Sequence, residues 1–143
     1  MSLVEVMRLA RQSQDYRGLA QAIPYMQALD IEVEQAGSSI ILVVQAHDIH
    51  IGNPWLPALH GGFIGGFLET AAIVQLILDQ DGDTLPKPIN ITVDYLRSGR
   101  VVETRAEARV TKLGRRVANV HASCWQDERD RPIATLSGHF LMT

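Results

Sequence analysis

Cysteine is almost missing from this sequence: Cys124 is the only one, so an internal disulfide is impossible. Neither positive nor negative charge is in large excess, and the net charge of -3 offers no long-range attraction for nucleic acid or an anionic membrane. The first segment, MSLVEVMRLARQSQDYR, lacks the basic-then-apolar order of a signal peptide. These absences predict a cytoplasmic protein without nucleic acid or a membrane as its partner. Cys124 itself is expected to be a small core residue, because it lies in a strand pattern without a CxxC neighbour.

The composition is that of an ordinary folded domain. Hydrophobic residues make up 46% and charged residues 20% of the 143 positions, far from the composition of a disordered chain. A chain of this length can bury one sufficient core. We therefore expect a single domain over residues 1–143, in which residues 1–25 form a helical leader.

Local periodicity divides the first part of the chain into short elements. Apolar residues at helical spacing indicate helices, whereas alternating and β-branched runs indicate strands. Glycine and two prolines then interrupt regular structure. The predicted elements are helices at 2–13 and 16–22, strands at 28–35 and 39–46 joined by a hairpin turn in QAGSS, and a loop at 47–58.

The longest apolar run, HGGFIGGFLETAAIVQLIL at residues 60–78, predicts a helix about 28 Å long. Glu69 is its one charged side chain. Four glycines near its start each disfavour a helix interior by about 1 kcal/mol, which suggests sites where another backbone comes close. A transmembrane helix is the alternative, because the length and the GxxxG spacings fit one. The central carboxylate, the lack of flanking basic anchors and the strand-rich remainder argue against it.

Four strand-like runs follow this helix. Between Val102 and Val110, small or apolar side chains alternate with charged ones, which predicts one core face and one wet face. The short connections force neighbouring strands to be antiparallel. Since a helix that is apolar on nearly all sides must be surrounded, the simplest α+β arrangement is a curved antiparallel sheet wrapped around it. The four runs are PINITVDYL, VVETRAEARVTKL, RRVANVHASCWQD and PIATLSGHFLMT.

Three motifs carry a family resemblance: LHGG at 59–62 with Glu69 two turns later, ITVDYLRSGR after the helix, and KLGRR at 112–116. Together with the element order, they resemble the hotdog-fold acyl-CoA thioesterases of the phenylacetate-pathway (PaaI-like) and 4-hydroxybenzoyl-CoA type. The resemblance covers the chain beyond the leader. It implies a hotdog fold and the hydrolysis of an acyl-CoA.

The resemblance also implies a set of catalytic residues. The family's helix carboxylate matches Glu69, and the glycine whose backbone N–H binds the thioester oxygen matches Gly61. The family's loop amide usually lies six residues before the histidine, where this chain has Pro54, so Asn53 one position earlier is the candidate. A hydroxyl that one branch of the family carries one turn after the acid is replaced here by Ile73.

The spacing of Gly61 and Glu69 has a consequence of its own. Eight residues in one helix separate them by about 12 Å along the axis, so they cannot both touch one carbonyl group. If both act on one thioester, a two-fold dimer with antiparallel helices, in which Gly61 of one chain faces Glu69 of the other, is the natural arrangement. The resemblance implies the same homodimer, and we expect a dimer of dimers.

An apolar pocket should raise the pKa of Glu69 toward the range of a general base. We expect Glu69 to activate water or to attack the thioester directly and form a mixed anhydride. The helix N-terminus and the Gly61 N–H would stabilise the oxyanion by about 3 kcal/mol per donor. The structural alternative is a carboxylate that is merely ion-paired, or exposed at a helix kink.

Several further residues are candidates for the site. His60 is expected to cap or orient the loop before the helix. His47 and His50 have HxxH spacing, but no further ligands are apparent, so we expect no metal and no other cofactor. Guanidinium groups in the turns LRSGR and LGRR could hold the phosphates of coenzyme A. The expected substrate contacts are Gly62, Trp55, Phe63, Arg97, Arg100, Arg115 and Arg116. Phe67 and Leu68 could also line the pocket, or could instead pack in the core.

The sequence therefore predicts an acyl-CoA thioesterase that acts without metal or redox cofactor. A non-catalytic hotdog protein that binds acyl-CoA, as a sensor or carrier, is the first alternative, since Pro54 and Ile73 depart from the family pattern. A hydratase is the weaker one, because His60 and Glu69 do not share a helical face.

Overall fold

The computed structural model describes residues 1–37 and 39–143. The helices and strands that the sequence predicts occur in the predicted order, with the longest helix in the middle of the chain, and a third helix, a 3-10 turn and a short hairpin are added before it. The elements are α1 (Leu3–Ser13), α2 (Leu19–Ala22), α3 (Pro24–Ala28), β1 (Ile31–Ala36), β2 (Ser39–Gln45), η1 (Asp48–His50), β3 (Ile51–Asn53), β4 (Ala58–Leu59), α4 (Gly61–Asp79), β5 (Lys87–Tyr95), β6 (Glu103–Leu113), β7 (Val117–Trp125) and β8 (Ala134–Leu141).

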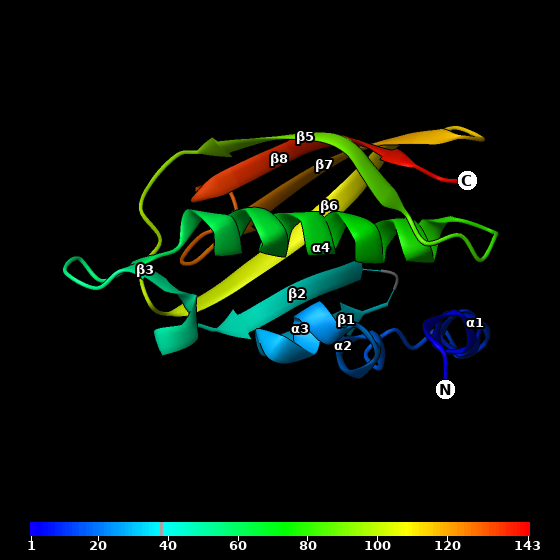
Figure 1. Ribbon diagram of the computed structural model, residues 1–143, viewed down its shortest axis with the longest axis horizontal. Helices are drawn as coiled ribbons and strands as arrows, with labels where there is room; N and C mark the ends of the chain where they lie inside the picture. Colours follow the sequence, from blue (N-terminus) through cyan, green and yellow to red (C-terminus); the bar gives the residue numbers. More distant parts are fainter. Residues whose placement is uncertain (38) are drawn as a thin grey trace.

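Six strands form one antiparallel sheet in the order β1-β2-β6-β7-β8-β5. Figure 1 shows α4 lying across one face of this sheet, with the leader helices beside its β1–β2 end. The antiparallel pairing and the helix-on-sheet arrangement are thus confirmed. In the predicted turn QAGSS, Gly37 has a φ of +63°, which favours glycine, and Ser38 lies outside the described residues.

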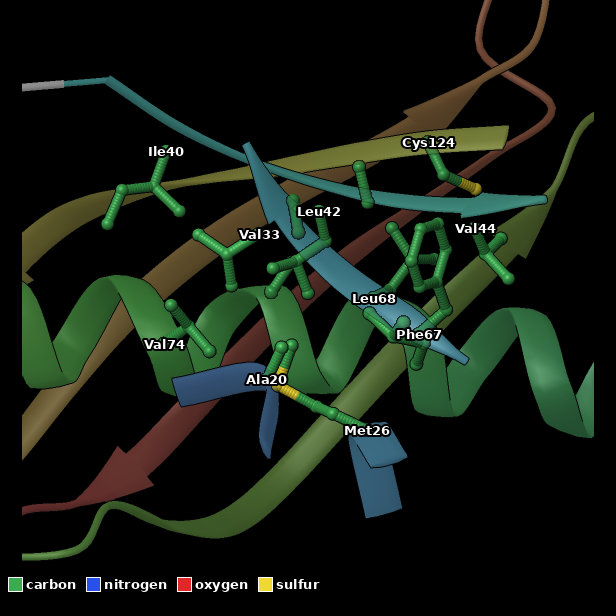
Figure 2. Close-up of a cluster of buried hydrophobic side chains, with 14 of the residues drawn as sticks. Ala20, Met26, Val33, Ile40, Leu42, Val44, Phe67, Leu68, Val74 and Cys124 are labelled. Carbon is green, nitrogen blue, oxygen red and sulfur yellow. The ribbon is translucent and has the colours of Figure 1, made fainter. Parts of the chain in front are cut away.

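The leader contains three helices, one more than expected. α1 begins with a capping box, in which the Ser2 hydroxyl accepts from the Glu5 N–H and the Glu5 carboxylate accepts from the Ser2 N–H. α3 is the additional helix, because Pro24 at its first position is preorganised for a helical turn. This helix delays β1, which starts later than predicted. Figure 2 shows Ala20 and Met26 reaching from the leader into the core cluster, where both are buried.

α4 lies at the centre of the core. It is long and apolar enough to cross a membrane by length and composition alone, but ten of its 19 residues are buried within the fold. Figure 2 shows Phe67, Leu68 and Val74 projecting from α4 among side chains of the sheet. Packing against the sheet therefore accounts for the apolar character of this helix.

The core face of β6 follows the predicted alternation with one exception. Thr104 and Ala106 are buried, and Ala106 pairs with the buried Cys124 across β7. Burial raises the pKa of the Cys124 thiol to about 12, consistent with its expected role in the core. Val102 is 37% exposed, contrary to the prediction, because it lies in the bend before β6 begins at Glu103.

The segment expected as a loop is more ordered than predicted. After η1, the strands β3 and β4 pair as a short hairpin, and a Cβ on Gly52 would lie 2.6 Å from the Cα of His60, so glycine is required for this approach. His50 is fully buried: its Nε2 donates to the Leu29 carbonyl at 2.8 Å, and its Nδ1 accepts from the His47 N–H at 3.0 Å. His50 therefore joins this segment to the end of the leader.

Replacing His50 with alanine should destabilise the protein by roughly 2–5 kcal/mol, because the change opens a cavity and leaves partly buried backbone groups of Leu29 and His47 without their His50 partner. Urea unfolding followed by circular dichroism measures the loss. His121→Ala is the matched control, since His121 is exposed on β7 and such a change is usually worth no more than about 0.5 kcal/mol. Equal effects of the two substitutions would contradict the structural role of His50.

Candidate active site

One stripe of α4 stays partly accessible along its length. Residues four, seven and eleven positions apart on a helix lie on one face, and Gly62, Gly66, Glu69 and Ile73 have this spacing, with all four partly or fully accessible. Gly61 and Gly65 flank them and are intermediate in burial. This face therefore carries glycines in the first turns of the helix and the Glu69 carboxylate further along.

The N-terminus of α4 is an open donor site. His60 is the N-cap residue, and its Nδ1 accepts a hydrogen bond from the Gly62 N–H at 2.8 Å. The capping role expected of His60 is therefore seen. Among the described residues, the Gly61 N–H has no acceptor. This free donor at the positive end of a 19-residue helix is suited to a developing oxyanion.

Tyr95 is a site residue that the sequence analysis missed. Its hydroxyl donates to the Gly61 carbonyl at 2.8 Å, and its ring lies 3.5 Å from the position of a Cβ on Gly61. Together with Leu59, Ile64 and Arg97, it lines a cavity of about 390 Å³ beside Gly61. Tyr95 thus fixes the first turn of α4 and forms one wall of the candidate site.

Glu69 lies partly buried on the accessible stripe. Burial raises the pKa of its carboxyl above the ordinary value of 4.5. No ion pair of Glu69 occurs among residues 1–37 and 39–143. A paired structural carboxylate would show the opposite pKa shift, so this environment favours a functional role over the structural alternative.

Tyr25 of α3 is the second residue that the sequence analysis missed. Its side chain lies against Gly66, where a Cβ would collide with the phenol. Burial and then the charge of Glu69 raise the pKa of Tyr25. The two tyrosines therefore flank the accessible stripe, Tyr95 at Gly61 and Gly65, and Tyr25 at Gly66.

These contacts show what lies beside the helix glycines within the chain. We expected the glycines to mark the approach of another backbone; within this chain their neighbours are side chains, and the approach of a second chain stays a prediction. Tyr95 occupies the space beside Gly61 and Gly65, and the ring of His60 lies 2.9 Å from a Cβ position on Gly62. The glycine pattern was the available signal, but the sequence could not say which side chains filled the space.

The loop before α4 contains the candidate amide. The Asn53 side-chain oxygen accepts from the Trp55 and Leu56 N–H groups at 3.0 and 3.4 Å, so this oxygen stabilises the loop. Its amide nitrogen donates to no acceptor in the described part of the chain. Trp55 is 93% exposed, and its role as a pocket residue stays a prediction.

Phe63, another predicted substrate contact, is 6% exposed and lies in the core. Its ring is stacked on Phe67 at 5.5 Å and tilted against His50 at 4.6 Å, measured between ring centroids. Among the described residues, no group of three or more histidine, cysteine or acidic side chains is arranged to hold a metal.

The four predicted phosphate-binding arginines fall into two distant pairs. Arg97 lines the cavity beside Gly61 and also an adjoining cavity of about 210 Å³ that contains Arg100. Arg100 is ion-paired with Asp127 at 2.7 Å. Arg115 lines a different cavity with Gln80, the C-cap of α4, and is thus at the opposite end of this helix, with Arg116 beside it. One chain alone does not bring the two pairs together.

A cavity of about 430 Å³ lies elsewhere, where the pairing of β2 with β6 ends. Glu107, Arg109 and His121 contribute to its lining. It shares no lining residue with the cavity beside Gly61 and contains no helix N-terminus. The smaller cavity is therefore the better candidate for thioester chemistry.

The chain is similar to several known proteins. Residues 51–141 match the family model of the acyl-CoA thioesterase N-terminal domain. A Chromobacterium violaceum protein of known structure is 31% identical over 97% of both chains, with a TM-score of 0.78. A Ralstonia eutropha protein described as a candidate thioesterase related to phenylacetic acid degradation is 20% identical over 88% of this chain and 98% of its own, with a TM-score of 0.74.

A Bacillus halodurans protein whose structure contains CoA is 19% identical over 98% of this chain and 88% of its own, with a TM-score of 0.75. No curated protein matches the chain. The family match covers more than half of the sequence, and the arrangement of α4 on the antiparallel sheet agrees with it. The chain therefore belongs to the acyl-CoA thioesterase family and has the hotdog fold.

Proposed function

We propose that the protein hydrolyses an acyl-CoA thioester to the free acid and coenzyme A, at a site shared by two copies of the chain. The observation that supports this most directly is Glu69, a carboxylate with a raised pKa on a partly accessible stripe of a helix that is mostly buried. Family membership and the CoA in the Bacillus halodurans relative support the substrate class.

The chemistry divides between two groups. Glu69 takes a proton from water as the water oxygen attacks the thioester carbon, or attacks that carbon itself and forms an anhydride that water then opens. The negative charge on the carbonyl oxygen is stabilised by the Gly61 N–H. The carbon–sulfur bond then breaks, and the thiolate leaves and is protonated. Thiolate is a good leaving group, so this chain's own residues can supply the catalysis.

The helix geometry requires a second copy. α4 is continuous from Gly61 to Asp79, so Gly61 and Glu69 are about 12 Å apart along its axis. An antiparallel copy that brings its Gly61 to this Glu69 has a two-fold axis beside Gly65, which lies midway between them. Within the chain, the neighbours of Gly65 on this side are the side chains of Tyr95 and Val93, so these side chains would lie beside the proposed axis.

The β5 strand supports the same arrangement. β5 is an edge of the sheet, paired only with β8 among the described strands, and most of its residues are exposed. Its residues Val93 and Tyr95 contact the glycine side of α4. A long unprotected edge favours pairing with another chain. The β5 edge and the glycine stripe therefore form one continuous surface for a second copy.

Antiparallel pairing also explains the two arginine pairs. The end of α4 near Arg115 and Arg116 lies about 21 Å from Gly65 along the axis, and Gly61 lies about 6 Å from it. In the second copy, that end lies on the same side of the axis as Gly61 of the first. The phosphates of one coenzyme A could then meet Arg97 of one chain and Arg115 of the other.

One observation favours non-catalytic binding as the second candidate. The Asn53 side-chain oxygen is committed to the loop, and Ile73 offers no hydroxyl beside Glu69. Such a site could hold acyl-CoA as a sensor or carrier. Release of free thiol from a panel of acyl-CoAs, measured with a disulfide reagent, separates hydrolysis from saturable binding without release.

Replacing Glu69 with glutamine should lower kcat for thioester hydrolysis by about 100-fold or more, because the amide cannot accept the proton or act as a nucleophile. Binding of coenzyme A, measured by calorimetry, should persist. A Glu69→Gln variant that hydrolyses the best acyl-CoA of the panel at the wild-type rate would show that the carboxylate is only structural.

The raised pKa of Glu69 also predicts a pH-dependent stability difference. Folding favours the neutral acid, so the stability from this group is present below the ordinary pKa of 4.5 and is lost as pH rises through the raised value. Glu69→Gln should therefore melt at a higher temperature than wild type at pH 7, and the difference should vanish below about pH 4. A lower melting temperature of the variant at pH 7 would contradict the assignment.

Replacing Gly65 with leucine should convert the dimer to monomers and remove the activity, because the leucine displaces Tyr95 and Val93 of its own chain into the space beside the proposed two-fold axis. Analytical ultracentrifugation and the thiol assay measure the two effects. Gly82→Leu is the matched control, since a Cβ at Gly82 meets no atom within 4 Å. A Gly65→Leu protein that remains an active dimer would exclude the shared site.

A further inference from the structure

Tyr25 occupies an unusual place beside α4. It lies in α3, yet its hydroxyl reaches Gly66, where its ring carbon Cζ is 2.9 Å from the position of a Cβ. Any side chain at position 66 would displace the phenol. The lack of a side chain at Gly66 therefore brings a leader residue onto the accessible stripe of the helix.

Helix geometry places this hydroxyl close to the carboxylate. Positions three apart on a helix have Cβ atoms about 5–6 Å apart, and helical side chains lean toward the preceding turn. The side chain of Glu69 consequently lies over the turn that contains Gly65 and Gly66. Since the Tyr25 hydroxyl occupies the Cβ site of Gly66, it is within reach of the Glu69 carboxylate.

The Tyr25 hydroxyl is available for this contact. Among the described residues, it donates to no protein acceptor, whereas the Tyr95 hydroxyl on the other side of the stripe is committed to the Gly61 carbonyl. Tyr25 is 43% exposed, so neither burial in the core nor another bond explains its orientation. The charge of Glu69 also raises the pKa of Tyr25, which agrees with their proximity.

We infer that Tyr25 is a positioning residue. Its hydroxyl makes no hydrogen bond to Glu69 in this structure, and a rotation of the Glu69 side chain brings one carboxylate oxygen to the hydroxyl as acceptor and leaves the other directed at the thioester. The inference rests on the proposed function, in which Glu69 is the catalytic group. In this inference, the leader contributes Tyr25 to the active site, and Gly66 leaves the space that the Tyr25 hydroxyl occupies. Tyr25 itself exchanges no proton in the reaction.

Tyr25→Phe tests the inference, because it removes one oxygen and keeps the ring. A hydrogen bond to a charged group supports a loss in kcat of about tenfold, with KM nearly unchanged. Losing a donor to the carboxylate disfavours its charged form, so the acidic limb of the kcat/KM profile should move to higher pH. The melting temperature should stay the same. An unchanged kcat together with an unmoved acidic limb would overturn the inference.

Two further variants make the test specific. Tyr16→Phe is the matched control, because Tyr16 is the leader's other tyrosine, is buried and does not touch the glycines of α4. Its kcat and acidic limb should equal those of wild type. Gly66→Ala displaces the Tyr25 hydroxyl without changing Tyr25 or Glu69, so it should reproduce the Tyr25→Phe effect. The double variant Tyr25→Phe/Gly66→Ala should lose no more activity than Tyr25→Phe alone. Additive losses would contradict the inference that Gly66→Ala acts by displacing the Tyr25 hydroxyl.

A measurement without catalysis separates this inference from the proposed function. If wild type releases no thiol from any acyl-CoA, hydrolysis fails but the contact between Tyr25 and Glu69 can still be titrated. The pKa of Tyr25, measured by ultraviolet difference titration against Tyr25→Phe, should fall in Glu69→Gln because a neighbouring negative charge is lost. An unchanged Tyr25 pKa would show that the two groups are not coupled, and would sink the inference whatever the activity.

Discussion

Burial of α4 against the sheet is the constraint on which the rest of this structure depends. The helix is apolar on nearly every side, and β2, β5, β6, β7 and β8 pack against it, with β1 and the leader completing the core cluster. The stripe of Gly62, Gly66, Glu69 and Ile73 remains partly accessible, and it carries the charged residue in the middle of the helix. The same burial that stabilises the fold also makes Glu69 a carboxylate of raised pKa.

The glycines at the start of α4 lower the stability of the helix but leave space beside it for other side chains. A glycine in a helix interior costs up to about 1 kcal/mol relative to alanine. In return, Tyr95 and Tyr25 can lie against the helix from β5 and α3. Two phenols thus border the stripe that leads to Glu69. Alanine at position 66 would favour the helix more than glycine does, but its Cβ would displace the Tyr25 phenol, so the lower helix propensity of this turn is linked to the proposed chemistry.

Helix length limits what one chain can do. The proposed oxyanion donor at Gly61 and the carboxylate at Glu69 belong to one continuous helix, in which they are about 12 Å apart along the axis, too far for both to contact one carbonyl group. The arginines at the two ends of the helix face the same limit. A second copy related by a two-fold axis would shorten both the distance from Gly61 to Glu69 and the distance between the two arginine pairs. The proposed site therefore depends on the proposed dimer.

Much of this was predictable from the sequence, because it depends on local patterns. The run from His60 to Leu78 determined the central helix, the alternation in the later strands determined the antiparallel sheet, and the histidine before two glycines indicated the N-cap. The spacing from Gly61 to Glu69 also led to the expectation of a second copy, which stays a prediction. The extra helix at Pro24, the exposure of Val102 and the two tyrosines beside α4 came only from the tertiary structure. Periodicity and spacing act along the chain, whereas the place of a side chain such as Tyr25, 41 residues before Gly66, depends on how distant elements pack in space.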